Sequence, residues 1–270
     1  MFEMRTTVRI VLGSYVAVHF AGLLPWAAEL FSDRGMLPDA KLSPLLRAFP
    51  NPLALCDGPI VVLALVLLGA LSGLALAAGR RDRLAAGIAL FVTASLFGRN
   101  PLIANPAMPY VGLLLLAWCA SPPPGRGRAW STAVLRALWI SMAVGYSYSG
   151  ITKLAAPSWV DGTAFVYVLE NPLARPGPLR ETLLSLPPWT LKALTWGTLT
   201  LEIGFAPLAL LRRARPWLWA AMLGMHIGLV LLIDFADLSL GMVVLHLCTA
   251  DPAWLRRGPN PNTCASLRLR

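Results

Sequence analysis

Apolar residues occur in eight long runs along the chain, and short polar or proline-rich segments separate these runs. Each run is continuous and does not alternate between apolar and polar positions, so the pattern predicts helices and not the strands of a barrel. The third, fourth and eighth runs are shorter than the roughly 20 residues that a perpendicular span needs. The expected spans are Val8–Phe31, Ile60–Ala78, Leu84–Phe97, Met108–Ala120, Ala133–Ile151, Leu191–Leu211, Trp217–Ile233 and Leu238–Ala250.

The overall composition indicates a protein that is partly surrounded by lipid. Hydrophobic residues make up 57% of the 270 positions, charged residues make up 13%, and the mean hydropathy is +0.64. A soluble domain of this length could not bury so much apolar surface in one core. The sequence therefore predicts an all-α, polytopic integral membrane helix bundle. Residues 1–258 are expected to form one transmembrane domain, and residues 259–270 a disordered cytoplasmic tail.

Arginine clusters between the runs set the expected orientation. Short loops rich in Lys and Arg stay in the cytoplasm, so the clusters Arg80–Arg83 and Arg212–Arg215 place both termini inside. The segment Asp234–Asp237 has no positive charge and falls outside. The expected location is the inner (cytoplasmic) membrane, with the lipid bilayer as partner. Although the net charge is +10, the basic residues flank spans and form no single face, so nucleic acid is not an expected partner.

Ionisable side chains within the apolar runs are candidates for function, because a charge at the centre of a span costs at least a few kcal/mol. Glu202 lies midway along the sixth span and His226 midway along the seventh, and we expect them to approach each other. The pair either holds two helices together or takes part in catalysis. His19, in the first span, is expected to pack and to bond a backbone carbonyl, and His246 lies nearer the inner side.

The end of the fifth span carries a second group of polar residues. Tyr146, Gly150 and Lys153 recur at i, i+4 and i+7 and therefore share one helix face, with the hydroxyl of Tyr148 nearby. A desolvated lysine there is a candidate base, because burial disfavours its charged form. The alternative is a lysine that reaches the outer headgroups beside an aromatic belt.

Arg99 and Asn100 stand at the outer end of the third span, directly before Pro101. Proline ends the helix at this point and leaves carbonyl groups without partners. Arg99 either holds an anion or carboxylate close to the membrane surface, or bonds the frayed helix end.

Several of these blocks together resemble a known family. The blocks are Arg99-Asn100-Pro101, a short apolar run ending in Pro122, Ser149-Gly150-Ile151-Thr152-Lys153-Leu154, Trp159-Val160-Asp161-Gly162, and Leu201-Glu202 with Pro207 and His226. They look like the HTTM (horizontally transferred transmembrane domain) family, bacterial membrane proteins related to vitamin K-dependent gamma-carboxylase. The likeness covers residues 5–257, and its most specific part is the lysine followed by Trp-x-acidic-Gly.

The resemblance implies a site as well as a fold. In the carboxylase, the lysine of this block is the proposed base in a reaction that uses oxygenated vitamin K hydroquinone and adds CO2 to a glutamate. It implies Lys153, Glu202 and His226 as catalytic residues, and no metal. It implies vitamin K hydroquinone or another quinol as cofactor, bound by Arg99, Asn100, Tyr146, Tyr148 and Trp159. Asn105-Pro106-Ala107 stands where the carboxylase has a histidine, and no counterpart of its large lumenal domain is expected.

Two classes of function fit these features. The first is a membrane enzyme that modifies an exported peptide or small molecule with a quinol-type lipid cofactor. The alternative is a non-catalytic membrane partner that matures an exported protein or confers immunity to a toxin. A transporter is disfavoured, because the sequence has no internal repeat and no paired interrupted helices.

Overall fold

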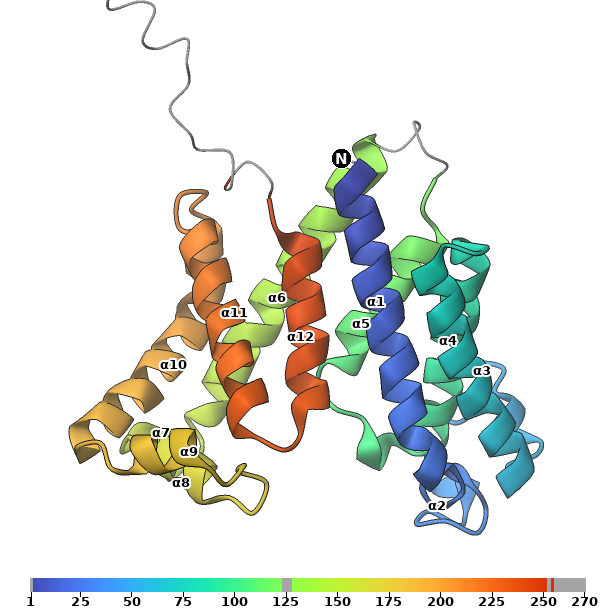
Figure 1. Cartoon of the computed structure of the whole chain (residues 1–270), viewed down its shortest axis with the longest axis horizontal. Coiled ribbons are helices and arrows are strands. Elements are labelled where there is room, and N and C mark those ends of the chain that lie inside the picture. Colours follow the sequence, from blue (N-terminus) through green and yellow to red (C-terminus); the bar gives the residue numbers. More distant parts are fainter. Residues whose placement is uncertain (1, 123–127, 252–253, 255–270) are drawn as a thin grey trace, which may run out of the picture.

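The computed structural model describes residues 2–122, 128–251 and 254 (Figure 1). Within these residues the chain forms helices and no strand, apart from one isolated antiparallel bridge between Ala174 and Ile233. The all-α prediction is therefore confirmed. The predicted tail, residues 259–270, lies outside the described residues.

Each of the eight predicted runs coincides with a long helix. The first run is interrupted, because Pro25 lies in a 3-10 turn, Leu24–Trp26, between α1 and the short helix α2, Ala27–Phe31. The long helices are α1 Phe2–Leu23, α3 Pro59–Ala78, α4 Asp82–Arg99, α5 Met108–Cys119, α6 Arg128–Lys153, α10 Pro188–Ala209, α11 Arg215–Leu232 and α12 Ala236–Thr249.

We expected eight membrane spans, but fewer of these helices are both long enough and apolar enough to cross a membrane. Among the described residues, three stretches are both long and apolar enough to cross a membrane: Thr6–Phe31, Pro59–Ala78 and Arg215–Leu232. Two further helices are apolar but short, Met108–Cys119 and Asp237–Thr249.

Polarity separates the remaining long helices from these candidates. Helices α6 and α10 have 26 and 22 residues, which is long enough to cross a bilayer. Both carry polar and charged side chains along their length, among them Arg136 in α6 and Lys192 and Glu202 in α10. Their place in or beside a membrane therefore depends on whether these side chains find partners inside the protein.

The helices form two groups that meet along α12. In the first group, α1 packs on α3, α3 on α4, and α4 on α5. Helices α6, α10 and α11 form the second group. Helix α12 packs on α11 and also on α1 and α5, so it joins the two groups (Figure 1). The short helices α7 Pro157–Val160, α8 Ala164–Glu170 and α9 Pro178–Leu184 lie with α2 at the end of the molecule opposite the N-terminus.

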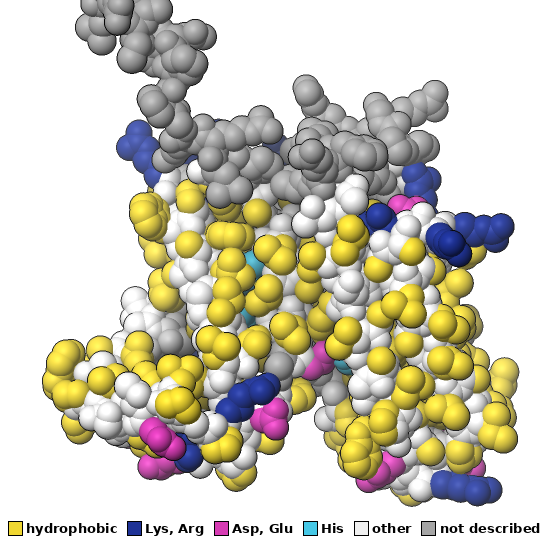
Figure 2. Space-filling view, in the orientation of Figure 1, with side chains coloured by type: hydrophobic (Ala, Val, Ile, Leu, Met, Phe, Trp, Pro, Cys, Tyr) yellow, Lys and Arg dark blue, Asp and Glu magenta, His cyan; other side chains and the backbone are white. Residues whose placement is uncertain are grey.

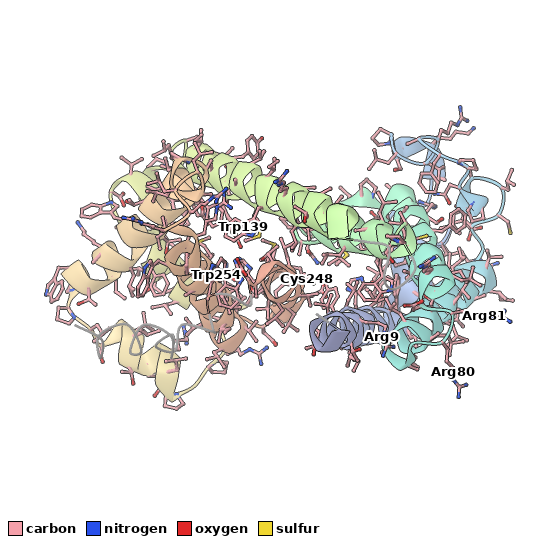
Figure 3. All side chains as sticks on the ribbon, turned by 90° about the horizontal axis from the view of Figure 1, so that it is seen from above. Arg9, Arg80, Arg81, Trp139, Cys248 and Trp254 are labelled. Atoms are coloured by element: carbon pink, nitrogen blue, oxygen red, sulfur yellow. The ribbon has the colours of Figure 1, made fainter. Side chains whose placement is uncertain are left out.

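Charged side chains on the surface lie mainly at the two ends of the molecule. Figure 2 shows apolar side chains over the middle, most Asp and Glu at the end that carries α7 to α9, and Lys and Arg there as well as at the end formed by the α3–α4 and α10–α11 turns. Seen from this end in Figure 3, Arg9, Arg80 and Arg81 lie over the group that contains α1 and α3. Arg9 donates hydrogen bonds to the carbonyls of Leu76 and Ala77, at 2.8 and 2.6 Å, and so ties α1 to the end of α3.

Candidate functional site

Lys153 and Glu202 form an ion pair between the end of α6 and the middle of α10. The Lys153 Nζ atom lies 2.5 Å from both carboxylate oxygens of Glu202. The Glu202 side chain is 4% exposed and that of Lys153 is 25% exposed. A β-carbon at Gly150 would lie 2.7 Å from the backbone nitrogen of Ile203, so only glycine allows the two helices to approach this closely. The pair thus bridges a tight helix crossing.

Trp159 covers the other side of the lysine. Nζ of Lys153 lies 4.7 Å from the centroid of the Trp159 ring, which is a cation–π distance. The carboxylate and the ring thus contact the lysine head group from two sides. Lys153 is therefore bonded to partners within the protein, while its side chain remains 25% exposed.

A tight turn after Trp159 fixes this arrangement. The Asp161 carboxylate accepts hydrogen bonds from the hydroxyl and the backbone N–H of Thr163, at 2.6 and 2.9 Å. These bonds, the hydroxyl bond first, lower the pKa of the exposed Asp161 below its ordinary value. Gly162 has φ +85°, a left-handed conformation that favours glycine. Trp196 of α10 donates from its indole nitrogen to the Val160 carbonyl, at 3.2 Å, so the turn is tied to the same helix that carries Glu202.

Tyr146 links two buried histidines deeper in the same group of helices. Its hydroxyl lies 2.8 Å from Nε2 of His226 and 3.5 Å from Nε2 of His246. Nδ1 of His246 lies 2.8 Å from the Met242 carbonyl and must carry a proton to bond it, which leaves Nε2 as an acceptor. The Tyr146 hydroxyl then donates to His246 and accepts from Nε2–H of His226. This leaves Nδ1 of His226 a bare acceptor, buried and without a partner in the described part of the chain.

Glu202 and His226, which we expected to approach each other, bond different partners in the structure. Glu202 bonds Lys153 and His226 bonds Tyr146, and no hydrogen bond joins Glu202 to His226 among the described residues. Tyr146 and Lys153 lie on one face of α6, as their spacing predicted, and this face lies against α10 at one end and reaches α11 and α12 at the other. One helix therefore supplies both partners.

Three of the five predicted cofactor residues lie elsewhere. Arg99 is fully buried in the first group of helices, where its Nε donates to Asp57 at 2.9 Å and its Nη2 to the Leu37 carbonyl at 2.8 Å. Asn100 donates to the Leu30 carbonyl at 2.7 Å. Arg99 thus holds the loop between α2 and α3 through a carboxylate and backbone carbonyls, and Asn100 bonds the end of α2. Tyr148 is 69% exposed, because two residues turn the side chain about 200° away from Tyr146.

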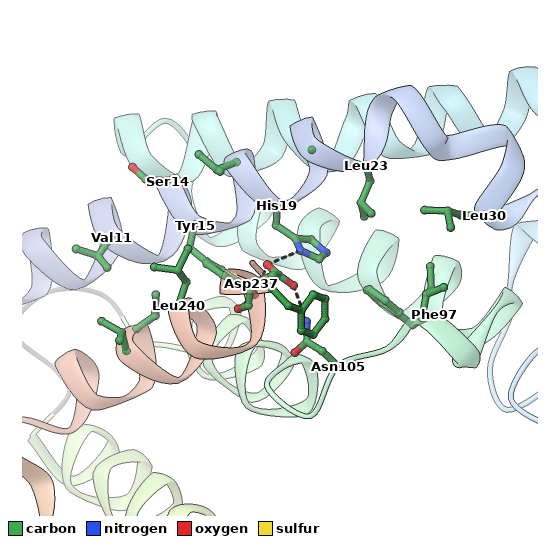
Figure 4. Close-up of a pocket in the computed structure, with 16 residues that line it drawn as sticks. Val11, Ser14, Tyr15, His19, Leu23, Leu30, Phe97, Asn105, Asp237 and Leu240 are labelled. Carbon is green, nitrogen blue, oxygen red and sulfur yellow. Dashed lines mark hydrogen bonds and ion pairs between the residues drawn. The ribbon is translucent and has the colours of Figure 1, made fainter. Parts of the chain in front are cut away.

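A second polar cluster, which the sequence did not reveal, surrounds Asp237 at the start of α12. Nδ1 of His19 lies 2.9 Å from Asp237 Oδ1, and the Tyr15 hydroxyl donates to the same oxygen at 3.1 Å. Asn105 donates to Oδ2 at 2.5 Å. The expectation that His19 bonds a backbone carbonyl was therefore wrong. Figure 4 shows the cluster on the wall of a cavity of about 640 Å³ between α1 and α12.

Two weak signals for this cluster were present in the sequence. Tyr15 and His19 are four residues apart and so share a face of α1. The expected resemblance drew attention to the segment Asn105-Pro106-Ala107 but indicated no partner for Asn105. Asp237 was interpreted only as a marker of topology.

No known family model, curated protein or solved structure matches the chain. The likeness to HTTM proteins thus stays an expectation from the sequence blocks, and function is argued from the geometry of the two clusters.

Proposed function

We propose that the chain is a polytopic membrane enzyme that transfers protons through Lys153, resembling the catalytic core of vitamin K-dependent gamma-carboxylase. It modifies an exported peptide or small molecule with a quinol-type lipid as cofactor. The observation that carries the proposal is the partly buried Lys153–Glu202 ion pair against Trp159, in which the Glu202 side chain is only 4% exposed. Buried, paired ionisable groups inside an apolar bundle are costly and are found mostly at functional sites.

The proposal places all eight long helices in the inner membrane, with both termini in the cytoplasm. Support comes from the way in which the less apolar helices bury their charges. Arg99 of α4 and Glu202 of α10 are 0% and 3% exposed and have partners inside the protein. The two basic turns Arg80–Arg83 and Arg212–Arg215 also lie at the same end of the molecule (Figure 1), as expected for a cytoplasmic face. Lys153 and the helices α7 to α9 then lie near the outer surface.

The ion pair supplies a base after one internal proton transfer. Nζ of Lys153 passes a proton to the Glu202 carboxylate, which leaves a neutral amine and a neutral acid. In a medium of low dielectric constant this removes two buried charges, which offsets part of the cost of the transfer. The amine then takes a proton from the substrate and becomes an ammonium that Trp159 stabilises, while Glu202 holds the first proton until solvent or a second acceptor removes it.

His226 offers a separate acceptor, which no hydrogen bond among the described residues joins to Glu202. Its bare Nδ1 is buried in the same group of helices, and the ring is joined through Tyr146 to His246. A free acceptor nitrogen beside aromatic rings suits the hydroxyl of a quinol-type molecule, with Tyr146 and Trp159 as the expected cofactor residues that lie in this region. Such a cofactor, when bound, supplies reducing electrons and phenolic protons.

The bonding of both Glu202 oxygens by Lys153 favours one alternative function. Lys153 satisfies both carboxylate oxygens of Glu202, as a purely structural pair would. In that case the chain is a non-catalytic membrane partner that matures an exported protein or gives immunity, and proton transfer through Lys153 plays no part.

Substitution of the lysine by arginine separates the two functions. Lys153→Arg keeps the positive charge for Glu202 but stays protonated, so it cannot act as a base. Exported peptides and small molecules would be compared by mass spectrometry between cells with the wild-type gene, cells without it and cells with the variant. The product that depends on the gene should be lost in Lys153→Arg and kept in Lys192→Arg, a control at an exposed lysine of α10. Full activity of Lys153→Arg at normal abundance would leave only the structural role.

A further inference from the structure

The cavity between α1 and α12 has one polar spot on otherwise apolar walls. Tyr15, His19, Asn105 and Asp237 form the spot, and aliphatic and aromatic side chains from both helices and from the end of α4 form most of the remaining wall (Figure 4). A volume of about 640 Å³ lies in the range of small-molecule sites in proteins. None of these residues belongs to the Lys153 cluster.

Every polar side-chain atom of the polar spot has at least one hydrogen-bond partner except one. Asp237 accepts from Tyr15, His19 and Asn105, so both of its oxygens have donors. In a neutral imidazole, donation from Nδ1 to this carboxylate leaves Nε2 as an acceptor. The His19 side chain is 92% buried. Its Nε2 atom is also buried and has no hydrogen-bond partner within residues 2–122, 128–251 and 254. A buried acceptor without a partner costs about 1–3 kcal/mol, and a ligand that donates to it removes this cost.

We propose that this cavity binds a neutral, membrane-dissolved molecule that carries a hydroxyl group at one end of an apolar body. The hydroxyl donates a hydrogen bond to Nε2 of His19, and the apolar body lies along the aliphatic wall that includes Val11 and Leu240. The site is separate from the proposed proton-transfer site and does not depend on it.

The lining excludes charged headgroups. Among the residues that the structure describes, no Lys or Arg lines the cavity, and the Asp237 carboxylate would repel a phosphate or a fatty-acid carboxylate. An ammonium would find both Asp237 oxygens already bonded to donors. A single uncharged donor therefore fits the polar spot best.

The mouth of the cavity opens on an apolar surface. Val18 of α1 and Leu240 of α12 line the cavity and are 69% and 39% exposed. Apolar side chains cover the middle of the face seen in Figure 2. With the helices in a bilayer, this mouth faces lipid tails. The ligand thus enters sideways from the membrane and not from water.

Histidine NMR provides a direct test, because the chain has only three histidines. The protein, labelled with ¹⁵N-histidine in phosphatidylcholine nanodiscs, is titrated with 4-nonylphenol, with 1-decanol and with 4-nonylanisole, which has no hydroxyl. The ¹⁵N signal of His19 Nε2, assigned by its loss in His19→Gln, should shift with a hydroxyl donor and stay unchanged with the anisole. Shifts with both hydroxyl compounds indicate a general alcohol site, and a shift with the phenol alone indicates a phenol or quinol site.

Two further variants test the site in case His19→Gln does not fold. Leu240→Trp fills the cavity and should abolish the shift of the His19 signal. Leu208→Trp on α10 is the control, because Leu208 is also 39% exposed but does not line the cavity, and it should shift as the wild type does. Lys153→Arg should bind the probes normally, so loss of the proposed enzyme function would leave this result intact. Equal shifts with the anisole, shifts confined to His226 or His246, or no shift with any probe would overturn the proposal.

Discussion

Lys153 and Glu202 lie 49 positions apart in the chain and meet in an ion pair at the crossing of α6 and α10. The pair accounts for a carboxylate in the middle of an apolar helix, because Glu202 alone at 4% side-chain exposure would be an uncompensated buried charge. It also makes the stability of the protein depend on both residues together and not on either one.

Removing one partner of this pair should destabilise the fold strongly. We expect Glu202→Leu to lower the free energy of unfolding by about 3–5 kcal/mol, because the Lys153 ammonium is left without a counter-charge. Glu202→Gln should cost less, because the amide still accepts a hydrogen bond. The double variant Lys153→Met with Glu202→Leu should recover most of the loss. Reversible unfolding in mixed micelles measures all of these values.

The control for this cycle is Lys192→Met, at an exposed lysine of the same helix, which should change stability by less than about 0.5 kcal/mol. If the losses from Lys153→Met and Glu202→Leu simply add in the double variant, the two side chains are not coupled and the ion pair does not stabilise the protein.

The hydroxyl of Tyr146 should matter for the two histidines that it joins. Tyr146→Phe leaves the acceptor of His246 and the Nε2–H of His226 without a partner, at a cost of about 1–3 kcal/mol. The ¹⁵N signals of both imidazoles should shift, and that of His19 should not. Tyr148→Phe is the matched control, because Tyr148 is 69% exposed and should be neutral in stability and in all three signals. Unchanged His226 and His246 signals in Tyr146→Phe would argue against the linked arrangement.

Local patterns in the sequence were sufficient to locate the helices and one face of α6. The eight apolar runs predicted the long helices because helical apolar runs are a local property, and the spacing of Tyr146, Gly150 and Lys153 placed these residues on one face. The count of spans did not follow as directly, because α6 and α10 carry polar residues whose cost depends on partners in other helices.

Contacts between distant segments could not be predicted in this way. Arg99 was expected beside the lysine, but its partners are Asp57 and loop carbonyls of the first helix group. Asp237 and His19 lie 218 positions apart, and only the packing of α12 against α1 brings them together. Helical spacing defines which residues share a face, whereas the neighbour of that face depends on the whole fold.

The turn at Asp161 should respond to pH. The hydroxyl of Thr163 stabilises the charged carboxylate, so Thr163→Val should raise the pKa of Asp161 towards its ordinary value. A carboxyl group with a lowered pKa in the folded state adds stability above its unfolded pKa, and this stability is lost as the pH falls through the folded pKa. The variant should lose it at a higher pH than the wild type does.

The carboxyl ¹³C signal of Asp161 in aspartate-labelled protein measures this titration. Thr152→Val is the control, because the Thr152 hydroxyl bonds the Ser149 carbonyl and no carboxylate. An unchanged midpoint in Thr163→Val would mean that the backbone N–H of Thr163 alone stabilises the charge.

The proposed orientation can be tested with cysteines introduced at two arginines. In a cysteine-free background, an impermeant thiol reagent added outside should label Arg175→Cys but not Arg213→Cys. Arg175 lies in the loop after α8, where its ion pair with Asp234 at 3.4 Å is on the surface and should be worth no more than about 1 kcal/mol. Arg213 belongs to the basic turn between α10 and α11. The reverse pattern would place Lys153 at the cytoplasmic face.

The close crossing of α6 and α10 should tolerate no side chain at Gly150. A β-carbon there would lie 2.7 Å from the Ile203 nitrogen and 2.9 Å from the Glu202 β-carbon, and neither the backbone nor the first side-chain atom can move without the helix. Gly150→Ala should therefore separate the helices and lower the free energy of unfolding by about 1–3 kcal/mol, despite the better helix propensity of alanine. Activity should fall with it, because Lys153 and Glu202 lie within one turn of the crossing.

Gly197→Ala on α10 is the matched control: its β-carbon would meet nothing within 4 Å, so the variant should be neutral or gain up to about 1 kcal/mol. Equal stability of the two variants would mean that the helices can part at no cost, and the ion pair could then not depend on the glycine contact.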